Sequence, residues 1–438
     1  MCIKKEITNM IEVVLINPPS LCVDDDRLEP SLGLLYIASM VRQSNFQVLI
    51  YEMTGCKNET EISRKIKEIP NGDVYGLSVL CTNYSYAKQC IEQIRSRNRK
   101  SMIILGGPNP TALPEFTLNN SKCDCVITGE GEDAFILALN AIQKGEPVPA
   151  IIRGAGRIDI DSYPMPAWDL VDLGSFNRVF DGERTVSLIS SRGCKYHCAH
   201  CNSTVMGAGS TQVRYRRAEN VVEEMKYLQK TGINKFRFND DNFTGNPDLP
   251  ALLIKIKELN VRYRSFGRIE DLTERNCRLL AESGCRHISV GLESLNPDNL
   301  KALGKENQSG LEANHLKNAK ENGIIIRAFF IVGLPYDNDK TIKKYFEICK
   351  DLPFDEYSVY PLIPYPGTSI AETPQYFGYE IVDRDFTHYV QIGQNRSTSF
   401  ALKHENFSEN DVRRWHNYVD SLLSSYRKVR QNQSEIAV

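Results

Sequence analysis

Short apolar runs alternate with longer amphipathic segments in the first third of the chain. Each run is only a few residues long, is rich in β-branched or aliphatic side chains and ends in a turn signal, which is typical of buried parallel strands. We predict strands at Val13–Ile16, Gln47–Tyr51, Val74–Val79, Met102–Leu105 and Cys125–Ile127. Helical patterns at Leu32–Ser44 and Tyr84–Arg97 lie between them. Repeated βα units of this kind predict a doubly wound parallel α/β sheet over residues 1–145.

The pattern breaks over residues 146–184, which are rich in Pro and Gly and have no sustained helical period. We interpret this segment as a linker between two domains. Alternation then resumes, with strands predicted at Val186–Ser190, Lys235–Phe238, Arg264–Gly267, His287–Gly291, Ile324–Val332 and Glu356–Pro361. Helices are predicted between them at Asn220–Gln229, Thr273–Ser283 and Ser309–Asn322. Six strand–helix units predict a partial (β/α)6 barrel over residues 185–372, with its chemistry at the carboxyl ends of the strands.

A short helical extension is predicted for residues 373–438. Ser408 and Asp411 stand three apart, as in a capping box, and apolar residues from Val412 to Tyr426 fall on one helical face. We expect this helix to close the barrel and the last eight residues to form a loose tail.

Composition and charge argue against several classes of protein for this chain. The chain has 438 residues and a formal net charge of −2, without a long run of one sign, so nucleic acid and membrane surfaces are not expected partners. No apolar stretch approaches the ~18 residues of a membrane span, and we expect a cytoplasmic protein. The 13 cysteines are an odd number and widely scattered, which favours buried thiols over a disulfide framework.

One cysteine group does have regular spacing. "SSRGCKYHCAHC" places Cys194, Cys198 and Cys201 in a C-x3-C-x2-C pattern directly after a predicted strand. Structural zinc normally takes four ligands in paired units, and the second pair is missing, although His197 or His200 could supply a ligand. Three thiolates suit three irons of an iron–sulfur cubane with the fourth iron open. Zinc and a cluster therefore both stay possible on spacing alone.

This spacing at the end of a first barrel strand resembles the radical S-adenosylmethionine (SAM) superfamily. The resemblance implies a 4Fe-4S cluster on Cys194, Cys198 and Cys201. Its open iron would chelate the amino and carboxylate groups of SAM, and reduction would give a 5'-deoxyadenosyl radical. His200 stands where the family more often has Phe or Tyr, beside the adenine.

Further motifs of the family follow in order along the predicted barrel. Asp240 and Asp241 in "FRFNDDNFTG" resemble its contact to the SAM ammonium, and Glu293 and Ser294 in "SVGLESLN" resemble its ribose- or methionine-binding pair. Taken singly, these residues could be helix caps or surface charges. Their order along the strands gives the resemblance its weight.

Two more segments and two arginines extend this pattern. "AFFIVGLPYDND" is similar to the family's G-L-P-G-E-T, with Tyr336 and Asp337 in place of Gly and Glu, and "PYPGTSIAE" is similar to its P-Y-P-G-T. Arg268 and Arg327 could bind a carboxylate, SAM included, or form structural ion pairs.

The amino-terminal domain resembles the Rossmann-like cobalamin-binding domain that precedes some radical SAM barrels. Its motifs "ILGGPNPTALPE" and "VITGEGEDAF" carry the candidate cobalamin-binding residues Gly106, Gly107, Gly129, Glu130 and Gly131. All seven histidines lie at or beyond His197, so this domain has none to ligate cobalt.

The resemblance implies an enzyme that uses a 4Fe-4S cluster, SAM and cobalamin to methylate a carbon of a small biosynthetic intermediate. It also implies an electron donor such as flavodoxin or ferredoxin. The alternatives are a cobalamin-independent radical dehydration, rearrangement or oxidation, and a zinc-stabilised ligand sensor without catalysis.

Overall fold

The computed structural model describes residues 11–207, 212–390 and 400–425, which divide into two compact units. The first unit comprises residues up to 21, 30–156 and 163–174. The second comprises residues 22–29, 157–162 and those from 175 onward, so a short early segment belongs to the later unit. Tyr426 and the predicted tail lie outside the described residues.

The first unit contains a six-stranded parallel sheet of order β2-β1-β3-β4-β5-β6. Its strands are β1 (Glu12–Asn17), β2 (Gln47–Glu52), β3 (Val74–Ser78), β4 (Met102–Gly106), β5 (Cys125–Gly129) and β6 (Ile151–Gly154). The predicted doubly wound sheet is confirmed. Strand β6 lies inside the segment predicted as a linker, because its apolar run of two isoleucines is too short to stand out in the sequence.

Helices cover both faces of this sheet. They are α1 (Leu32–Gln43), α2 (Glu59–Lys67), α3 (Tyr84–Arg97), α4 (Pro108–Ala112), α5 (Pro114–Ser121) and α6 (Gly131–Lys144). Val14 and Ile16 pack into one apolar core with α2 and α3, whereas Val13 and Leu15 pack into another with α1 and α6. Alternate side chains of β1 therefore pack into two different cores, which explains why consecutive residues of the strand are apolar.

The second unit contains a curved sheet of order β15-β14-β13-β12-β11-β8-β7. The strands are β7 (Val179–Phe180), β8 (Glu183–Leu188), β11 (Lys235–Phe238), β12 (Arg262–Gly267), β13 (Cys285–Glu293), β14 (Ile325–Val332) and β15 (Glu356–Pro361). All pairs are parallel except β7 with β8. The predicted partial barrel of six strand–helix units is confirmed.

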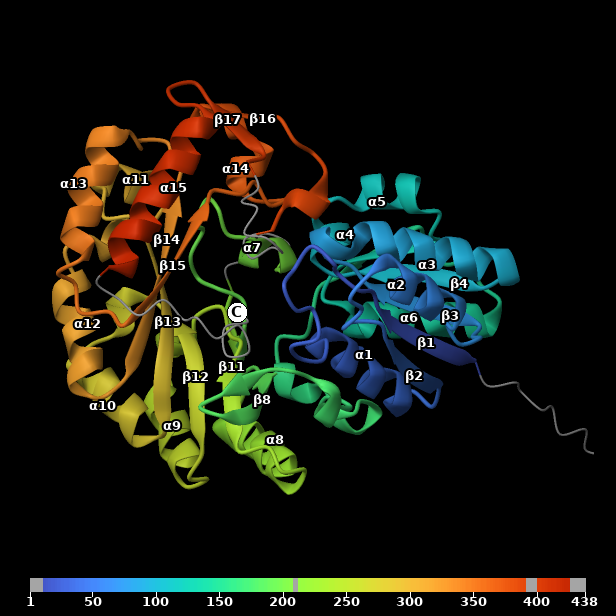
Figure 1. Ribbon diagram of the computed structural model, residues 1–438. Coiled ribbons are helices and arrows are strands. Elements are labelled where there is room, and N and C mark those ends of the chain that lie inside the picture. The colour runs from blue at the N-terminus through green and yellow to red at the C-terminus, as the bar shows by residue number, and fades with distance from the viewer. Residues whose placement is uncertain (1–10, 208–211, 391–399, 426–438) are drawn as a thin grey trace, which may run out of the picture. The chain divides into compact units, whose positions relative to one another are not determined.

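Helices follow these strands along the outer side of the curved sheet (Figure 1). They are α8 (Ala218–Lys230), α9 (Leu249–Lys257), α10 (Glu274–Glu282), α12 (Glu312–Glu321) and α13 (Asp339–Cys349). Shorter elements complete the unit: β9 (Ser191–Arg192), α7 (Ser203–Met206), β10 (Arg214–Tyr215), α11 (Pro297–Ala302) and α14 (Ser369–Glu372).

The carboxy-terminal region combines a small sheet with a helix. Helix α15 (Glu409–Ser424) begins with the predicted capping box, in which Ser408 and Asp411 each bond the other's backbone N–H. Strands β16 (Tyr379–Ile381) and β17 (Leu402–His404) form an antiparallel pair before it. The predicted helical C-terminus is confirmed, and these two strands, which are too short to show an alternating pattern, add to it.

The inner face of the barrel sheet is charged. Phe236 and Phe238 of β11 are buried in the apolar layer, and Arg237 between them points to the opposite face. Arg237 lies in register with Arg264 of β12, which lies in register with His287 of β13. Since Arg237 and Arg264 are at most 4% exposed, their charge needs compensation inside the protein.

A carboxylate from the segment 22–29 supplies part of that compensation. Glu29 accepts a 2.8 Å hydrogen bond from Nη1 of Arg237 and lies 3.2 Å from Nε of Arg178, and it also contacts the Ser187 hydroxyl. Burial acts to raise the pKa of Glu29, but the guanidinium groups of Arg178 and Arg237 outweigh it and hold the pKa below its ordinary value. The segment is thereby fixed to the barrel interior.

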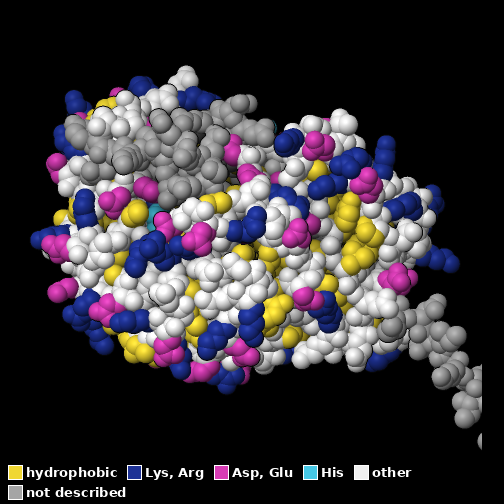
Figure 2. Space-filling view, turned by 60° about the horizontal axis from the view of Figure 1, so that its bottom comes forward, with side chains coloured by type: hydrophobic (Ala, Val, Ile, Leu, Met, Phe, Trp, Pro, Cys, Tyr) yellow, Lys and Arg dark blue, Asp and Glu magenta, His cyan; other side chains and the backbone are white. Residues whose placement is uncertain are grey.

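Figure 2 shows the distribution of charged side chains on one face of the molecule. On the face shown in Figure 2, basic and acidic side chains are interspersed. Within the described residues, every helix is too short or too polar to cross a bilayer.

Replacement of Glu29 tests its role in the barrel. Glu29→Gln should lower the free energy of unfolding by about 3–5 kcal/mol, because Arg237 stays buried without its anion. Since the folded-state pKa lies below the unfolded value of about 4.3, the carboxylate stabilises at neutral pH and this contribution is lost as the pH falls through the folded pKa. The difference in the free energy of unfolding between wild type and variant, measured in urea, should therefore become smaller at acidic pH. The exposed control Glu258→Gln should change little at either pH.

Candidate functional site

The three predicted cluster cysteines lie on one loop that follows β8. Backbone N–H of Cys201 donates to the carbonyl of Cys198 at 3.0 Å, which makes a tight turn between them. Ala199 is bonded on both sides, by its N–H to the carbonyl of Leu303 and by its carbonyl to the N–H of Ile370, each at 3.1 Å. The loop is thus tied to the chain beyond β13 and to the chain beyond β15.

All three cysteine thiols are free and half-buried. Sγ of Cys198 accepts a hydrogen bond from Nη1 of Arg268 at 3.5 Å, and Sγ of Cys201 lies 3.2 Å from the Ser203 hydroxyl. Among the residues that the structure describes, no three His, Cys, Asp or Glu side chains converge on a point that would hold one metal ion. Zinc needs such a point, whereas each thiolate of a cubane binds a different iron. Three thiols on one loop suit the cubane that the resemblance implies, in which each thiolate binds one iron.

The two neighbouring aspartates after β11 have different surroundings. Asp240 is 2% exposed and accepts hydrogen bonds from Ser190 N–H at 3.0 Å, Ser190 Oγ at 2.7 Å and Ser191 Oγ at 2.5 Å. Burial raises the pKa of Asp240 to about 6, although these donors act in the opposite direction. Asp241 is exposed and accepts from Ser203 Oγ at 2.8 Å. Asp240 therefore holds the end of β8, and Asp241 is the accessible acceptor of the pair.

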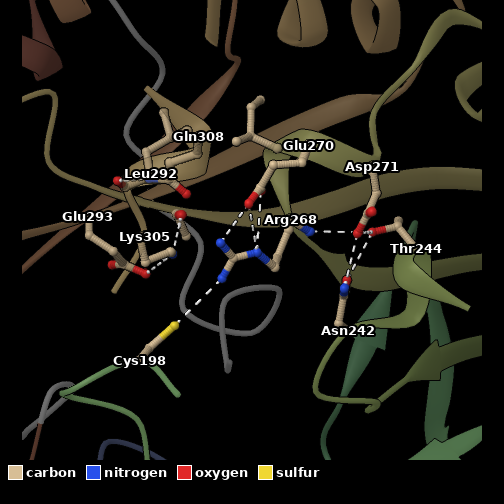
Figure 3. Close-up of polar contacts among 12 residues, drawn as sticks. Cys198, Asn242, Thr244, Arg268, Glu270, Asp271, Leu292, Glu293, Lys305 and Gln308 are labelled. Carbon is tan, nitrogen blue, oxygen red and sulfur yellow. Dashed lines mark hydrogen bonds and ion pairs between the residues drawn. The ribbon is translucent and has the colours of Figure 1, made fainter. Parts of the chain in front are cut away.

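Glu293 ends β13 in an unusual backbone conformation. Its φ is +60°, a left-handed value uncommon for a residue with a side chain, and it lies at a shift in the register with β14. The carboxylate pairs with Nζ of Lys305 at 2.9 Å, and the same ammonium donates to the carbonyl of Gly291 at 2.6 Å (Figure 3). A Cβ on Gly291 would lie 2.2 Å from Oε1 of Glu293, so only glycine leaves room for the pair.

His200 approaches the same carboxylate from the cysteine loop. Its Nε2 lies 3.6 Å from Oε1 of Glu293. Burial would raise the pKa of Glu293, but the charges of Lys305 and His200 lower it to about 2. Nδ1 of His200 is buried without a hydrogen-bond partner among the described residues. A buried polar atom in this state is a typical position for a ligand group.

Other predicted residues have local partners. Ser294 is buried and its hydroxyl accepts from the N–H of Asn296 at 3.1 Å. Arg327 lies inside the barrel, where Nε and Nη2 donate to the Ser358 hydroxyl at 3.1 and 2.7 Å. Asp337 accepts from the N–H groups of Gly333 and Leu334, both at 2.9 Å, and so stabilises its own turn.

The candidate residues of the first unit lie at the carboxyl edge of its sheet. Gly107 has φ of +108°, and a Cβ there would lie 2.8 Å from the Val79 carbonyl, so glycine is required by the approach of two loops. Gly129 donates its N–H to Thr111 Oγ1 at 3.0 Å. Gly106, in contrast, borders open space, since a Cβ there would meet one backbone atom, at 3.8 Å. Glu130 is the N-cap of α6, and Gly131 is the first residue of that helix.

This edge has two further features of a ligand site. The strand order reverses between β1 and β3, and open α/β sheets bind ligands at such a point. Nδ2 of Asn109, in the short helix α4 after β4, is buried without a hydrogen-bond partner among the described residues. The edge therefore combines the expected position of a ligand site with an unused hydrogen-bond donor.

Comparison with known families agrees with this geometry. Residues 188–349 match the radical SAM superfamily, and residues 26–139 match the B12 binding domain. The chain therefore contains a radical SAM domain and a B12-binding domain. The radical SAM match starts at the last residue of β8 and includes the cysteine loop.

Relatives of the chain include several methyltransferases. An uncharacterized methyltransferase of Pyrococcus horikoshii is 28% identical over 363 residues, covering 78% of each chain. The bacteriochlorophyllide d C-12(1)-methyltransferase of Chlorobaculum tepidum is 24% identical over 371 residues, covering 82% of this chain and 77% of that protein.

A solved structure shares the fold of both units. It is TsrM from Kitasatospora setae, a radical SAM methyltransferase with cobalamin and a [4Fe-4S] cluster bound. It matches with a TM-score of 0.68 and 18% identity, covering 95% of this chain and 91% of that one.

Several residues of the site were not predicted from the sequence. Lys305, Glu270 and Ser203 carry no motif. Ser203 meets Asp241 because loops after different strands converge, whereas Lys305 and Glu270 each pair with a residue of their own strand–helix connection. The one available signal is the charge of Lys305 and Glu270, which many surface residues share.

The Glu293–Lys305 pair should be strongly coupled. Glu293→Gln and Lys305→Met should each lower the free energy of unfolding by about 3 kcal/mol, because each leaves one buried charge alone. The double variant should lose less than the sum, with a coupling energy of at least about 1 kcal/mol in urea unfolding. The same cycle on the exposed pair Lys317 and Glu321 should show no measurable coupling. Additive losses at Glu293 and Lys305 would contradict the observed pairing.

Proposed function

We propose that this protein is an enzyme that binds a 4Fe-4S cluster through Cys194, Cys198 and Cys201, together with SAM and cobalamin. It methylates an unactivated carbon of a small molecule. The observation that carries the proposal is the loop of three half-buried thiols, fixed at the carboxyl ends of the barrel strands, with no single-ion site among the described residues.

The cofactors supply the difficult chemistry: a reduced cluster and SAM give a carbon-centred radical, and cobalamin carries a methyl group. The chain's part is to bind and orient. Glu293, with its pKa of about 2, stays ionised at every physiological pH and is an acceptor for hydroxyl or ammonium groups of SAM. His200 Nδ1 and Asp241 offer further contacts close to the cysteine loop.

Methyl transfer is favoured over other radical outcomes by the relatives, several of which are named methyltransferases. The matched B12-binding segment contains no histidine, so cobalt receives no imidazole ligand from it. We further propose a cytoplasmic location and a reductant such as flavodoxin or ferredoxin, because the cluster needs one electron for each cleavage of SAM.

Loss of a cluster cysteine should abolish cofactor assembly. Wild-type protein reconstituted without oxygen should hold about four irons and four sulfides and, with dithionite, release 5'-deoxyadenosine from SAM. Cys198→Ala should lose both properties. Cys277→Ala, which removes a buried thiol from α10, should retain them. Zinc without iron in the wild type, or SAM cleavage by Cys198→Ala, would refute the cluster assignment.

Methyl transfer can be tested with labelled SAM and a cobalamin-blocking variant. Extracts of cells that contain the wild type should form a compound bearing the SAM methyl label, absent with Cys198→Ala. Gly106→Phe should bind less hydroxocobalamin by gel filtration and form less of this compound, yet keep iron and uncoupled SAM cleavage. Glu92→Phe on the exposed side of α3 is the matched control. Label confined to methionine, with product formed without cobalamin, would favour a radical dehydration, rearrangement or oxidation.

A further inference from the structure

The guanidinium group of Arg268 is held on three sides beside the cysteine loop. Nη1 donates to Sγ of Cys198 at 3.5 Å, while Nε and Nη2 donate to the Glu270 carboxylate at 3.1 and 2.6 Å (Figure 3). Its Cζ lies 3.7 Å from the centroid of the Tyr196 ring. The side chain is only 9% exposed, so these contacts are shielded from water.

The backbone of Arg268 is fixed as firmly as its side chain. Its N–H donates to Thr244 Oγ1 at 3.3 Å, and Thr244 Oγ1 donates to Asp271 Oδ2 at 3.1 Å. Asn242 donates to the same carboxylate oxygen at 3.0 Å. The preceding Gly267 leaves space for Thr244, since a Cβ there would lie 2.4 Å from Oγ1. These contacts at the end of β12 therefore hold the backbone of Arg268 in one position.

These contacts decide between the two roles that the sequence leaves open for Arg268. A guanidinium binds a carboxylate through its Nε and Nη2 groups or through its Nη1 and Nη2 groups. Glu270 occupies the first pair, and the second pair is divided between Glu270 and Cys198. The remaining Nη1 points at a thiol. Arg268 also differs from the group beside Cys201, the neutral Ser203 hydroxyl, because arginine stays protonated at all relevant pH values.

We propose that Arg268 is a positioning residue that raises the reduction potential of the cluster held by Cys198. The inference rests on the proposed function. One-electron reduction adds negative charge to the irons and sulfurs, and a cationic N–H donor stabilises the reduced form more than the oxidised form. Hydrogen bonds to cluster sulfurs and local net charge are two established determinants of such potentials.

The test is the midpoint potential of the reconstituted cluster, without SAM, from a dithionite titration followed by electron paramagnetic resonance. Arg268→Gln should keep four irons but shift the reduced-to-oxidised ratio at least tenfold toward the oxidised form, about 59 mV for one electron. Arg268→Lys retains the charge and should shift less. The matched control is Arg278→Gln, which removes an exposed charge from α10 and should leave the potential unchanged.

An Arg268→Gln cluster with the wild-type potential would overturn the inference and leave the proposed function intact. If Arg268→Gln fails to fold or loses iron, the second uncharged variant Arg268→Met decides: a potential below that of the wild type supports the inference, and an equal potential overturns it. Wild-type protein that binds no iron would overturn the proposed function and the inference together, and the iron content separates that case from the others.

Discussion

Buried charge is the constraint that orders the second unit. Arg237, Lys305 and Arg268 are each buried, and an unpaired charge in such a place costs several kcal/mol. Each is matched by a carboxylate, from Glu29, Glu293 and Glu270 respectively. Satisfying these pairs requires the early segment, the bulge of β13 and the end of β12 to take defined positions. Cys198 and His200 then contact Arg268 and Glu293, whose side chains are held by these ion pairs.

Strands with a strong apolar pattern could be predicted from sequence, and weakly patterned ones could not. The strands of the first sheet up to β5 and the six parallel barrel strands each contain enough apolar or β-branched residues to be recognised. Strand β6 has only Ile151 and Ile152, while β16 and β17 have three residues each. Their pairing depends on the neighbouring strand or on each other, and single-sequence periodicity does not contain that information.

The sequence predicted the residue types of the site better than their individual roles. Asp240 and Asp241 are adjacent and chemically identical, yet one is enclosed by serine donors and the other faces outward. Successive residues at a strand end point to opposite sides. A sequence motif therefore identifies both aspartates as candidates but does not predict which one is buried. The left-handed backbone of Glu293 and its pairing with Lys305 occur at a register shift between β13 and β14. The residue types at these positions do not predict such a shift.

The position of segment 22–29 has a consequence for how the chain acquires its structure. During synthesis Glu29 emerges 149 residues before Arg178 and 208 residues before Arg237, so its partners do not yet exist while the first unit is being made. Contacts of such long sequence separation are slow to form. The barrel is also not a continuous piece of chain: a fragment that starts after residue 174 would contain every barrel strand and all three cluster cysteines, but not this carboxylate. Segments of the two units alternate along the chain, so a cut at residue 174 would separate Glu29 from the arginines that it neutralises.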